Sequence, residues 1–273
     1  MDITTIGGII FGIALMAFAV ISTEGIEGVK AFWDLPAFLL VFGGTFAALL
    51  VNFPLSRVIG VIKVLKKVLR AEEEDTSEII TTFVKFSHKS RTEGFLSLEE
   101  DIKTLKNDFL KRGIQLVIDG SDQEFIRTML ETELGFISER HRVGREMFTA
   151  LGTYSPAFGI IGTVLGMILM LRTLSDPSKV SGMMAIALVA AFYGLGAGYL
   201  LFLPMAGKLG RRSEEELFIK EIIIRGVLLL QSGASPSVIE SNLKAYLEPA
   251  ERTKLGAKKG TGSSEAPSSS PTA

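Results

Sequence analysis

Charged and apolar residues are sharply separated along this chain. Four stretches, residues 3–23, 35–56, 147–171 and 180–207, contain no Asp, Glu, Lys, Arg or His. Each has roughly the 20 residues that an α-helix needs to cross a ~30 Å hydrocarbon core. Short connections join the stretches in pairs, so the pattern predicts an all-α membrane protein with four transmembrane helices in two hairpins. The first stretch lacks the basic start and cleavage site of a signal peptide and is predicted to be retained.

The polar block at residues 57–146 is predicted to be a helical domain. Apolar residues recur there at helical spacing in two sets: Ile79, Phe83 and Phe86, and then Ile126, Leu130 and Leu134. Ser121, followed three residues later by Glu124, has the form of a capping box at a helix start. No proline follows until Pro156. We therefore expect one long helix that continues into the third span.

The chain divides into five parts on this pattern. A first transmembrane hairpin at 1–56 precedes the helical domain at 57–146, and a second hairpin follows at 147–207. C-terminal helices are expected at 208–249, where Ser235 and Pro236 have N-cap and first-turn chemistry for a short helix ending near Leu247. The tail at 250–273 is rich in Lys, Gly, Ser, Pro and Thr and is predicted to be disordered.

Lysine and arginine counts predict the orientation in the membrane. The central block carries 16 of the 29 basic residues, the segment after the fourth span carries 10, and the two short connections carry only three. The positive-inside rule then places the block and both termini in the cytoplasm. A net charge of −1 gives no indication of nucleic-acid binding, and the chain has no cysteine for disulfides or thiolate metal sites.

The spans contain repeated glycines and two prolines, and each of these features has two possible structural roles. Glycines recur four residues apart at positions 8 and 12, 162 and 166, and 194 and 198, a spacing that permits close helix packing within one subunit or around a partner. Pro156 and Pro204 lie toward the cytoplasmic ends of the antiparallel second hairpin. They are either kink sites that take part in movement or simple helix-end prolines.

The spans also lack the groups that ion pumps ordinarily use. With no ionisable side chain at membrane depth, any titrating carboxylate on an ion path must come from another chain. Thr163, Tyr154, Tyr193 and Tyr199 are polar groups of the second hairpin, although a hydroxyl in a span usually bonds its own helix backbone. The sequence contains no P-loop, zinc-ligand spacing or nucleophile elbow, so we expect neither an enzyme nor a bound cofactor.

Three segments resemble the MotA/PomA family of flagellar motor stator proteins, within the MotA/TolQ/ExbB proton channel superfamily. They are residues 90–99 (SRTEGFLSLE), residues 154–163 (YSPAFGIIGT) and the run 187–204, in the order and topology of that family. The resemblance implies a homopentamer in the bacterial inner membrane around a dimer of a MotB- or PomB-like single-span protein. It also implies torque on the rotor protein FliG, with Arg91 and Glu99 facing the rotor and Gly94 interrupting the helix between them.

The resemblance implies an ion path but leaves the ion open. Pro156 and Pro204 match family prolines that couple ion passage to movement, and Tyr193 is placed with them. Thr163 matches a threonine of sodium-driven members, whereas Ala191 stands where span four usually has threonine. H⁺ is slightly favoured over Na⁺, with Thr163 a possible Na⁺ contact and no other metal expected. The alternatives are an ExbB/TolQ-like subunit that energises outer-membrane processes, typically with three spans, and a self-contained transporter.

Overall fold

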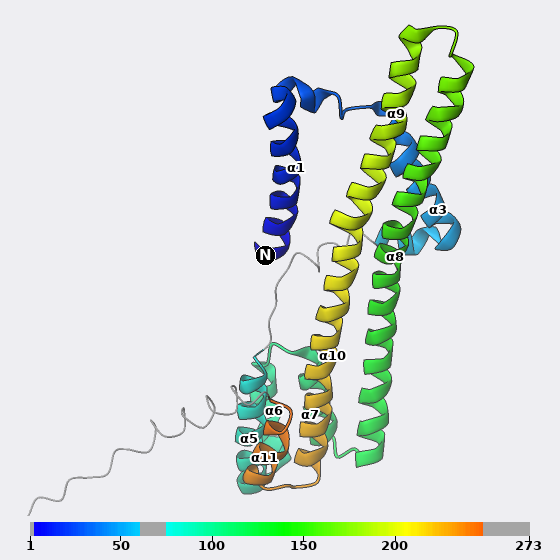
Figure 1. Ribbon diagram of the computed structural model, residues 1–273. Helices are drawn as coiled ribbons and strands as arrows, with labels where there is room; N and C mark the ends of the chain where they lie inside the picture. The colour runs from blue at the N-terminus through cyan, green and yellow to red at the C-terminus, as the bar shows by residue number, and fades with distance from the viewer. Residues whose placement is uncertain (1–2, 61–74, 248–273) are drawn as a thin grey trace, which may run out of the picture. The chain divides into compact units, whose positions relative to one another are not determined.

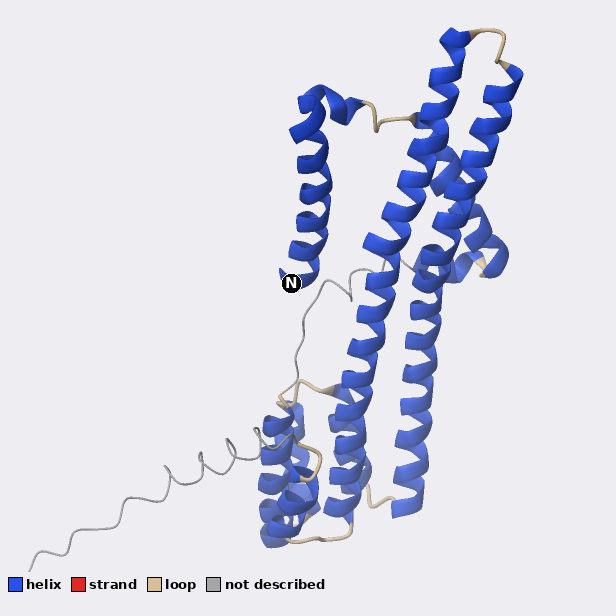
Figure 2. Ribbon diagram, in the orientation of Figure 1, coloured by secondary structure: helices blue, strands red, loops and turns tan. Residues whose placement is uncertain are grey.

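The computed structural model describes residues 3–60 and 75–247, and within these ranges the ordered elements are helices (Figures 1 and 2). The chain forms two compact units. We call the first the membrane unit, which comprises Met1–Glu72 and Glu139–Ser213, and the second the peripheral unit, which comprises Glu73–Ser138 and Glu214–Ala273. The predicted tail at 250–273 lies outside the described residues.

The first hairpin of the membrane unit contains a kink in its first helix and a π-helical segment in its second. Helix α1 spans Ile3–Lys30 and is kinked at Gly25, whose φ is 69°. After a short connection, α2 (Leu35–Phe38), the π-helix η1 (Leu39–Gly43) and α3 (Gly44–Asn52) follow one another without a gap. The first helix therefore continues past residue 23, where the charge-free stretch ends.

The second hairpin consists of very long helices. Helix α8 spans Gln123–Arg172, which is 50 residues, and contains Pro156 in its interior. Helix α9 (Pro177–Leu195) continues through the π-helix η3 (Gly196–Phe202) into α10 (Leu203–Gln231). The expectation of one helix running from the polar block into the third span is confirmed.

Four helical segments are long and apolar enough to cross a membrane, as predicted. The second of them is shorter than the charge-free stretch at 35–56, because α3 ends at Asn52. Phe53 is extended, with φ −126° and ψ 142°, which is the conformation that a following proline, here Pro54, imposes. Helix resumes at residue 55.

The peripheral unit is a small helical domain with its own core. It contains α5 (Thr76–Glu93), the 3₁₀-helix η2 (Phe95–Leu98), α6 (Glu99–Lys103), α7 (Asp108–Ile118) and α11 (Pro236–Lys244), with one end each of α8 and α10. Its fully buried side chains include members of both predicted stripes: Ile80, Phe83, Leu98, Ile114, Ile126, Leu130, Ile222, Ile223, Leu230 and Ile239.

One predicted helix start is wrong by one residue. Asp122, rather than Ser121, caps α8, and its carboxylate accepts a hydrogen bond of 2.9 Å from the Phe125 amide. Ser121 instead closes α7, because its amide donates to the Leu116 carbonyl across Gly120, whose φ is 73°. The predicted Ser235 cap of α11 is confirmed by a hydrogen bond from the Val238 amide, but the helix ends at Lys244 rather than near Leu247.

Candidate functional site

A seam of small residues joins α8 to the helix formed by α9 and η3, which lies beside it (Figure 1). The members of this glycine seam are Gly152, Gly159, Gly162 and Gly166 on α8, and Ala187, Ala190, Gly194 and Gly198 on the facing helix. A methyl group on Gly194 would lie 2.7 Å from the Ser155 carbonyl oxygen and 2.9 Å from the Gly159 α-carbon. The two backbones therefore touch directly, as small residues permit in lipid.

The glycine seam shows that the repeated glycines of the second hairpin pack within one subunit. Positions 162, 166, 194 and 198 pack within one chain. In the first hairpin, a methyl group added to Gly12 would meet Leu200, whereas one added to Gly8 would meet none of the described residues outside its own helix backbone within 4 Å. Packing within one subunit is thus confirmed for the glycines of the second hairpin, and packing around a partner stays a prediction.

The two predicted prolines lie on neighbouring turns of the seam. The Pro156 ring packs on Gly198, where an added methyl group would meet the proline Cγ atom at 2.7 Å. One turn earlier on α8, Gly152 packs against Leu203, the residue before Pro204. Both prolines therefore occupy the same end of the second hairpin, as the antiparallel arrangement predicted.

The π-helix η3 explains how Pro204 is accommodated without a break. The Leu203 amide bonds to the Gly198 carbonyl five residues back, and Pro204 then falls in the first turn of α10. A proline lacks the amide that would continue the regular pattern, and a wider turn before it shifts the backbone register so that the helix can proceed. Sequence reasoning missed this element, although the three glycines within residues 194–198, shortly before a proline, were a visible signal.

Pro156 is preceded by an unusual hydroxyl that sequence reasoning also missed. Ser155 is 0% exposed, and its hydroxyl has no hydrogen-bond partner among the described residues. A buried polar group without a partner costs free energy. The glycine seam therefore holds one poorly satisfied polar atom next to its proline.

Thr163 and Ala191 lie near the same interface. The Thr163 hydroxyl donates a 2.7 Å hydrogen bond to the Ile160 carbonyl, which leaves its oxygen lone pairs free to accept. Ala191 faces α8 at the level of Gly159, since a methyl group on that glycine would lie 3.4 Å from the Ala191 α-carbon. No hydroxyl stands at position 191 to supply a second oxygen from the facing helix.

Tyr193 faces the first hairpin. Its hydroxyl donates to the Phe32 carbonyl and accepts a 3.3 Å hydrogen bond from the Asp34 amide. Its ring packs 6.3 Å from those of Phe38 and Phe42. The tyrosine predicted for the ion path thus holds the connection between the first two spans against α9.

The second group of predicted residues lies in the peripheral unit, on one tight loop. Arg91 is exposed in the last turn of α5, and Glu99 is the exposed first residue of α6. Between them Gly94 adopts φ 83°, so the helix is interrupted as expected. Leu98 is completely buried and fixes the loop to the core, whereas Leu96 is 73% exposed. We call residues 91–99 the charged loop.

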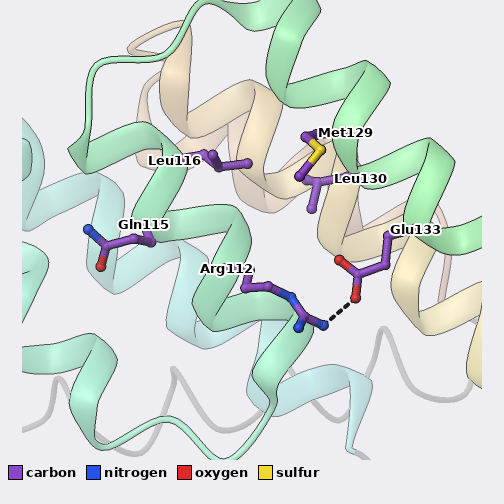
Figure 3. Close-up of a pocket in the computed structure, with 6 residues that line it drawn as sticks. All are labelled: Arg112, Gln115, Leu116, Met129, Leu130 and Glu133. Atoms are coloured by element: carbon purple, nitrogen blue, oxygen red, sulfur yellow. Dashed lines mark hydrogen bonds and ion pairs between the residues drawn. The ribbon is translucent and has the colours of Figure 1, made fainter.

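A shallow groove between α7 and α8 lies elsewhere in the peripheral unit (Figure 3). Leu116, Met129 and Leu130 form its apolar lining, and Arg112 pairs with Glu133 across it. Because these two charged lining residues satisfy each other, the groove offers little to attract a charged ligand. None of the predicted functional residues lines it.

These features define a class of protein. Four helical segments, each with a long stretch free of Asp, Glu, Lys, Arg and His, form a helical wall that can border an ion path, and a glycine seam joins the last two. These stretches contain no carboxylate or imidazole that could bind and release a proton near neutral pH, and no charged side chain that could hold an ion. The chain is a multi-pass membrane protein of this helical type.

Comparison with known proteins agrees with this class. A model of the MotA/TolQ/ExbB proton channel family matches residues 101–222. Motility protein A of Treponema phagedenis is 38% identical and is matched over 88% of this chain and 94% of its own. Chemotaxis protein PomA of Vibrio alginolyticus is 34% identical over 92% of this chain and 98% of its own.

A solved structure matches equally well. The flagellar MotAB stator complex from Bacillus subtilis contains a chain that superposes with a TM-score of 0.86 at 31% identity, over 93% of this chain and 99% of that one. This chain belongs to the MotA/PomA branch of the MotA/TolQ/ExbB proton channel family, and it is a membrane-embedded bacterial protein.

Proposed function

We propose that this chain is the ion-conducting stator subunit of a bacterial flagellar motor and not an enzyme. The observation that carries the proposal is the charge-free helical wall of the membrane unit, whose close-packed seam has both prolines beside it but no carboxylate or imidazole that could bind a proton. Relatives over nearly the whole chain are named Motility protein A and Chemotaxis protein PomA. The charged loop gives the same chain an exposed surface for a partner.

The missing carboxylate defines the first partner. A MotB- or PomB-like single-span protein, acting as a dimer, would supply an aspartate to the ion path, in line with a solved relative that is a MotAB complex. Several copies of this chain, five in the family, would surround that dimer within membrane lipid. The distribution of basic residues supports an inner-membrane orientation with both termini in the cytoplasm.

The prolines and the glycine seam support a coupling role. Because Pro156 packs on Gly198, ion binding beside one helix would displace the other through direct contact. Loss of the regular helix bond at each proline makes bending at that level less costly than elsewhere. Movement at this level would then reach the rotor protein FliG through Arg91 and Glu99 of the charged loop.

The coupling ion is proposed to be H⁺. Sodium must exchange its hydration shell for several oxygen ligands, and the second hairpin provides the Thr163 hydroxyl but only a methyl group at Ala191. A single threonine oxygen is a poor replacement for a hydration shell.

Complementation of a motile host that lacks its own stator genes tests the function. This chain and its MotB-like partner should restore swimming, and Arg91→Glu should lower torque while the membrane level of the complex stays normal. Arg225→Glu, an exposed arginine of α10 in the same unit, is the matched control and should swim normally. Restored outer-membrane energisation without swimming would instead identify an ExbB/TolQ-like subunit.

Swimming speed measured against sodium concentration, with and without a protonophore, tests the ion. A proton-driven complex should stop with the protonophore at every sodium concentration. Speed that rises with sodium while the protonophore is present would contradict the H⁺ assignment. In that case Thr163→Ala should weaken the sodium dependence, and an unchanged dependence would remove Thr163 from the ion path.

A further inference from the structure

The charged loop leads into three consecutive acidic residues whose surroundings differ. Glu99 and Glu100 are exposed, but the Asp101 carboxylate turns toward α5 and binds the Lys89 ammonium at 2.7 Å. Lys85, one turn earlier on α5, lies 4.0 Å from the other oxygen of Asp101. Asp101 is thus engaged in an internal contact, whereas Glu99 is available to a partner.

The Lys89–Asp101 pair closes the charged loop at its base. Lys89 precedes Arg91 by two residues, and Asp101 follows Glu99 by two, so both partner-facing charges lie within the segment that the pair closes. The two paired side chains are only 29% and 24% exposed, against 70% for Lys85. This shelter reduces the screening that makes fully exposed ion pairs weak.

The hydrogen bonds within the loop are local: the Gly94 amide donates to the Ser90 carbonyl, and the Ser97 amide and hydroxyl both donate to the Gly94 carbonyl. They do not reach from α5 to α6. Leu98 and Ile102 anchor η2 and α6 in the core, and Gly94 allows the reversal of direction with its positive φ. Apolar burial is not directional, so it does not set how close the first turn of α6 stands to the last turn of α5. A hydrogen-bonded ion pair does set this, because it has a defined length and angle.

We propose, on the basis of the proposed rotor contact, that the Lys89–Asp101 ion pair is the positioning clamp that holds Arg91 and Glu99 at a fixed separation for the rotor. Asp101 also raises the pKa of Lys89, chiefly through their hydrogen bond, so the lysine stays charged throughout the physiological range. The clamp acts through Arg91 and Glu99 and does not itself touch the partner.

Charge reversal and charge exchange test the clamp in the full complex. Lys89→Glu and Asp101→Lys should each lower motor torque by up to about fivefold, because the loop then holds the working arrangement for a smaller fraction of the time. The double variant Lys89→Glu/Asp101→Lys should recover most of the torque, because the pair re-forms with the charges exchanged. Lys89→Arg should stay close to the unaltered protein. Torque is measured under high load, together with the amount of complex in the membrane.

Lys244→Glu is the matched control. Lys244 pairs with Glu240 on α11 at 2.8 Å, and these side chains are 25% and 18% exposed, which is similar shelter away from the charged loop. If Lys244→Glu lowers torque as much as Lys89→Glu, or if the exchanged pair fails to recover it, the clamp is overturned. If Arg91→Glu lowers torque but neither Lys89→Glu nor Asp101→Lys does, the proposed clamp is wrong while the rotor contact stands. If Arg91→Glu leaves torque unchanged, the proposed rotor contact is wrong, and the clamp that rests on it falls with it.

Discussion

The two units of this chain reach close packing by opposite means. In the membrane unit the glycine seam brings backbone against backbone, with glycine and alanine at nearly every contact. In the peripheral unit the core is filled by large side chains such as Phe83, Ile114 and Ile126, each completely buried. Lipid tails are as apolar as leucine, so burying large side chains brings little gain in a membrane, whereas in water it is the main driving force.

The contrast shows which substitutions each unit tolerates. Where side chains fill a core, removing atoms leaves a cavity. Where backbones touch, adding a single methyl group forces the helices apart. Gly226 of the peripheral unit also makes a close contact, but a methyl group added there would meet the edge of the Phe83 ring, at 2.5 Å, rather than another backbone.

The largest expected effect is on the peripheral core. Phe83→Ala should destabilise this unit by about 3–5 kcal/mol, the usual cost of removing a buried phenylalanine ring. The spans should still insert, because their apolar surface is unchanged. Limited proteolysis of membranes should show rapid cleavage within residues 75–138 and intact spans. Phe136→Ala, at a side chain that is 72% exposed, should be cleaved no faster than the unaltered chain.

A smaller loss is expected at the glycine seam. Gly194→Ala should cost about 1–3 kcal/mol, because its methyl group would meet the backbone of Ser155 and Gly159 at 2.7 to 3.1 Å, and backbone cannot rotate away. Gly182→Ala on the same helix meets none of the described residues within 4 Å and should be neutral or slightly stabilising. Thermal unfolding of the purified complex in detergent measures both. Equal midpoints for the two variants would contradict the backbone contact.

The smallest effect, and of opposite sign, is expected at Ser155. Ser155→Ala removes a buried hydroxyl that has no partner among the described residues, so the variant should be as stable as the unaltered chain or more stable by up to about 1 kcal/mol. The same thermal measurement applies, with Ser181→Ala, at an exposed serine of α9, as the control. A clear loss of stability would show that the hydroxyl has a partner in the assembled complex.

Much of the architecture could be predicted because it rests on strong local patterns. Charge-free stretches defined the four spans, and the spacing of Ile79, Phe83 and Phe86 identified the buried face of α5. Pro54 forces the preceding residue, Phe53, into an extended conformation, so the helix of the second span ends at Asn52. These signals lie within a few residues of the feature they predict.

Other features depended on contacts between distant residues. The Tyr193 hydroxyl binds backbone atoms about 160 positions away, and no local pattern indicates that partner. The Lys89–Asp101 pair needed the reversal at Gly94 before its two members could meet. The start of α8 was missed for a different reason, because Ser121 and Asp122 are both good caps and the choice was made by the end of α7.

The π-helix η3 has a consequence for anyone who scans the fourth span residue by residue. A π turn takes in about one residue more than an α turn, so the side chains on either side of Gly196–Phe202 do not share one continuous helical wheel. A cysteine or tryptophan scan should therefore show two separate periodic series, out of phase by about one residue, that meet within this segment. A single unbroken wave through Pro204 would show that the wider turns are not retained in the working motor.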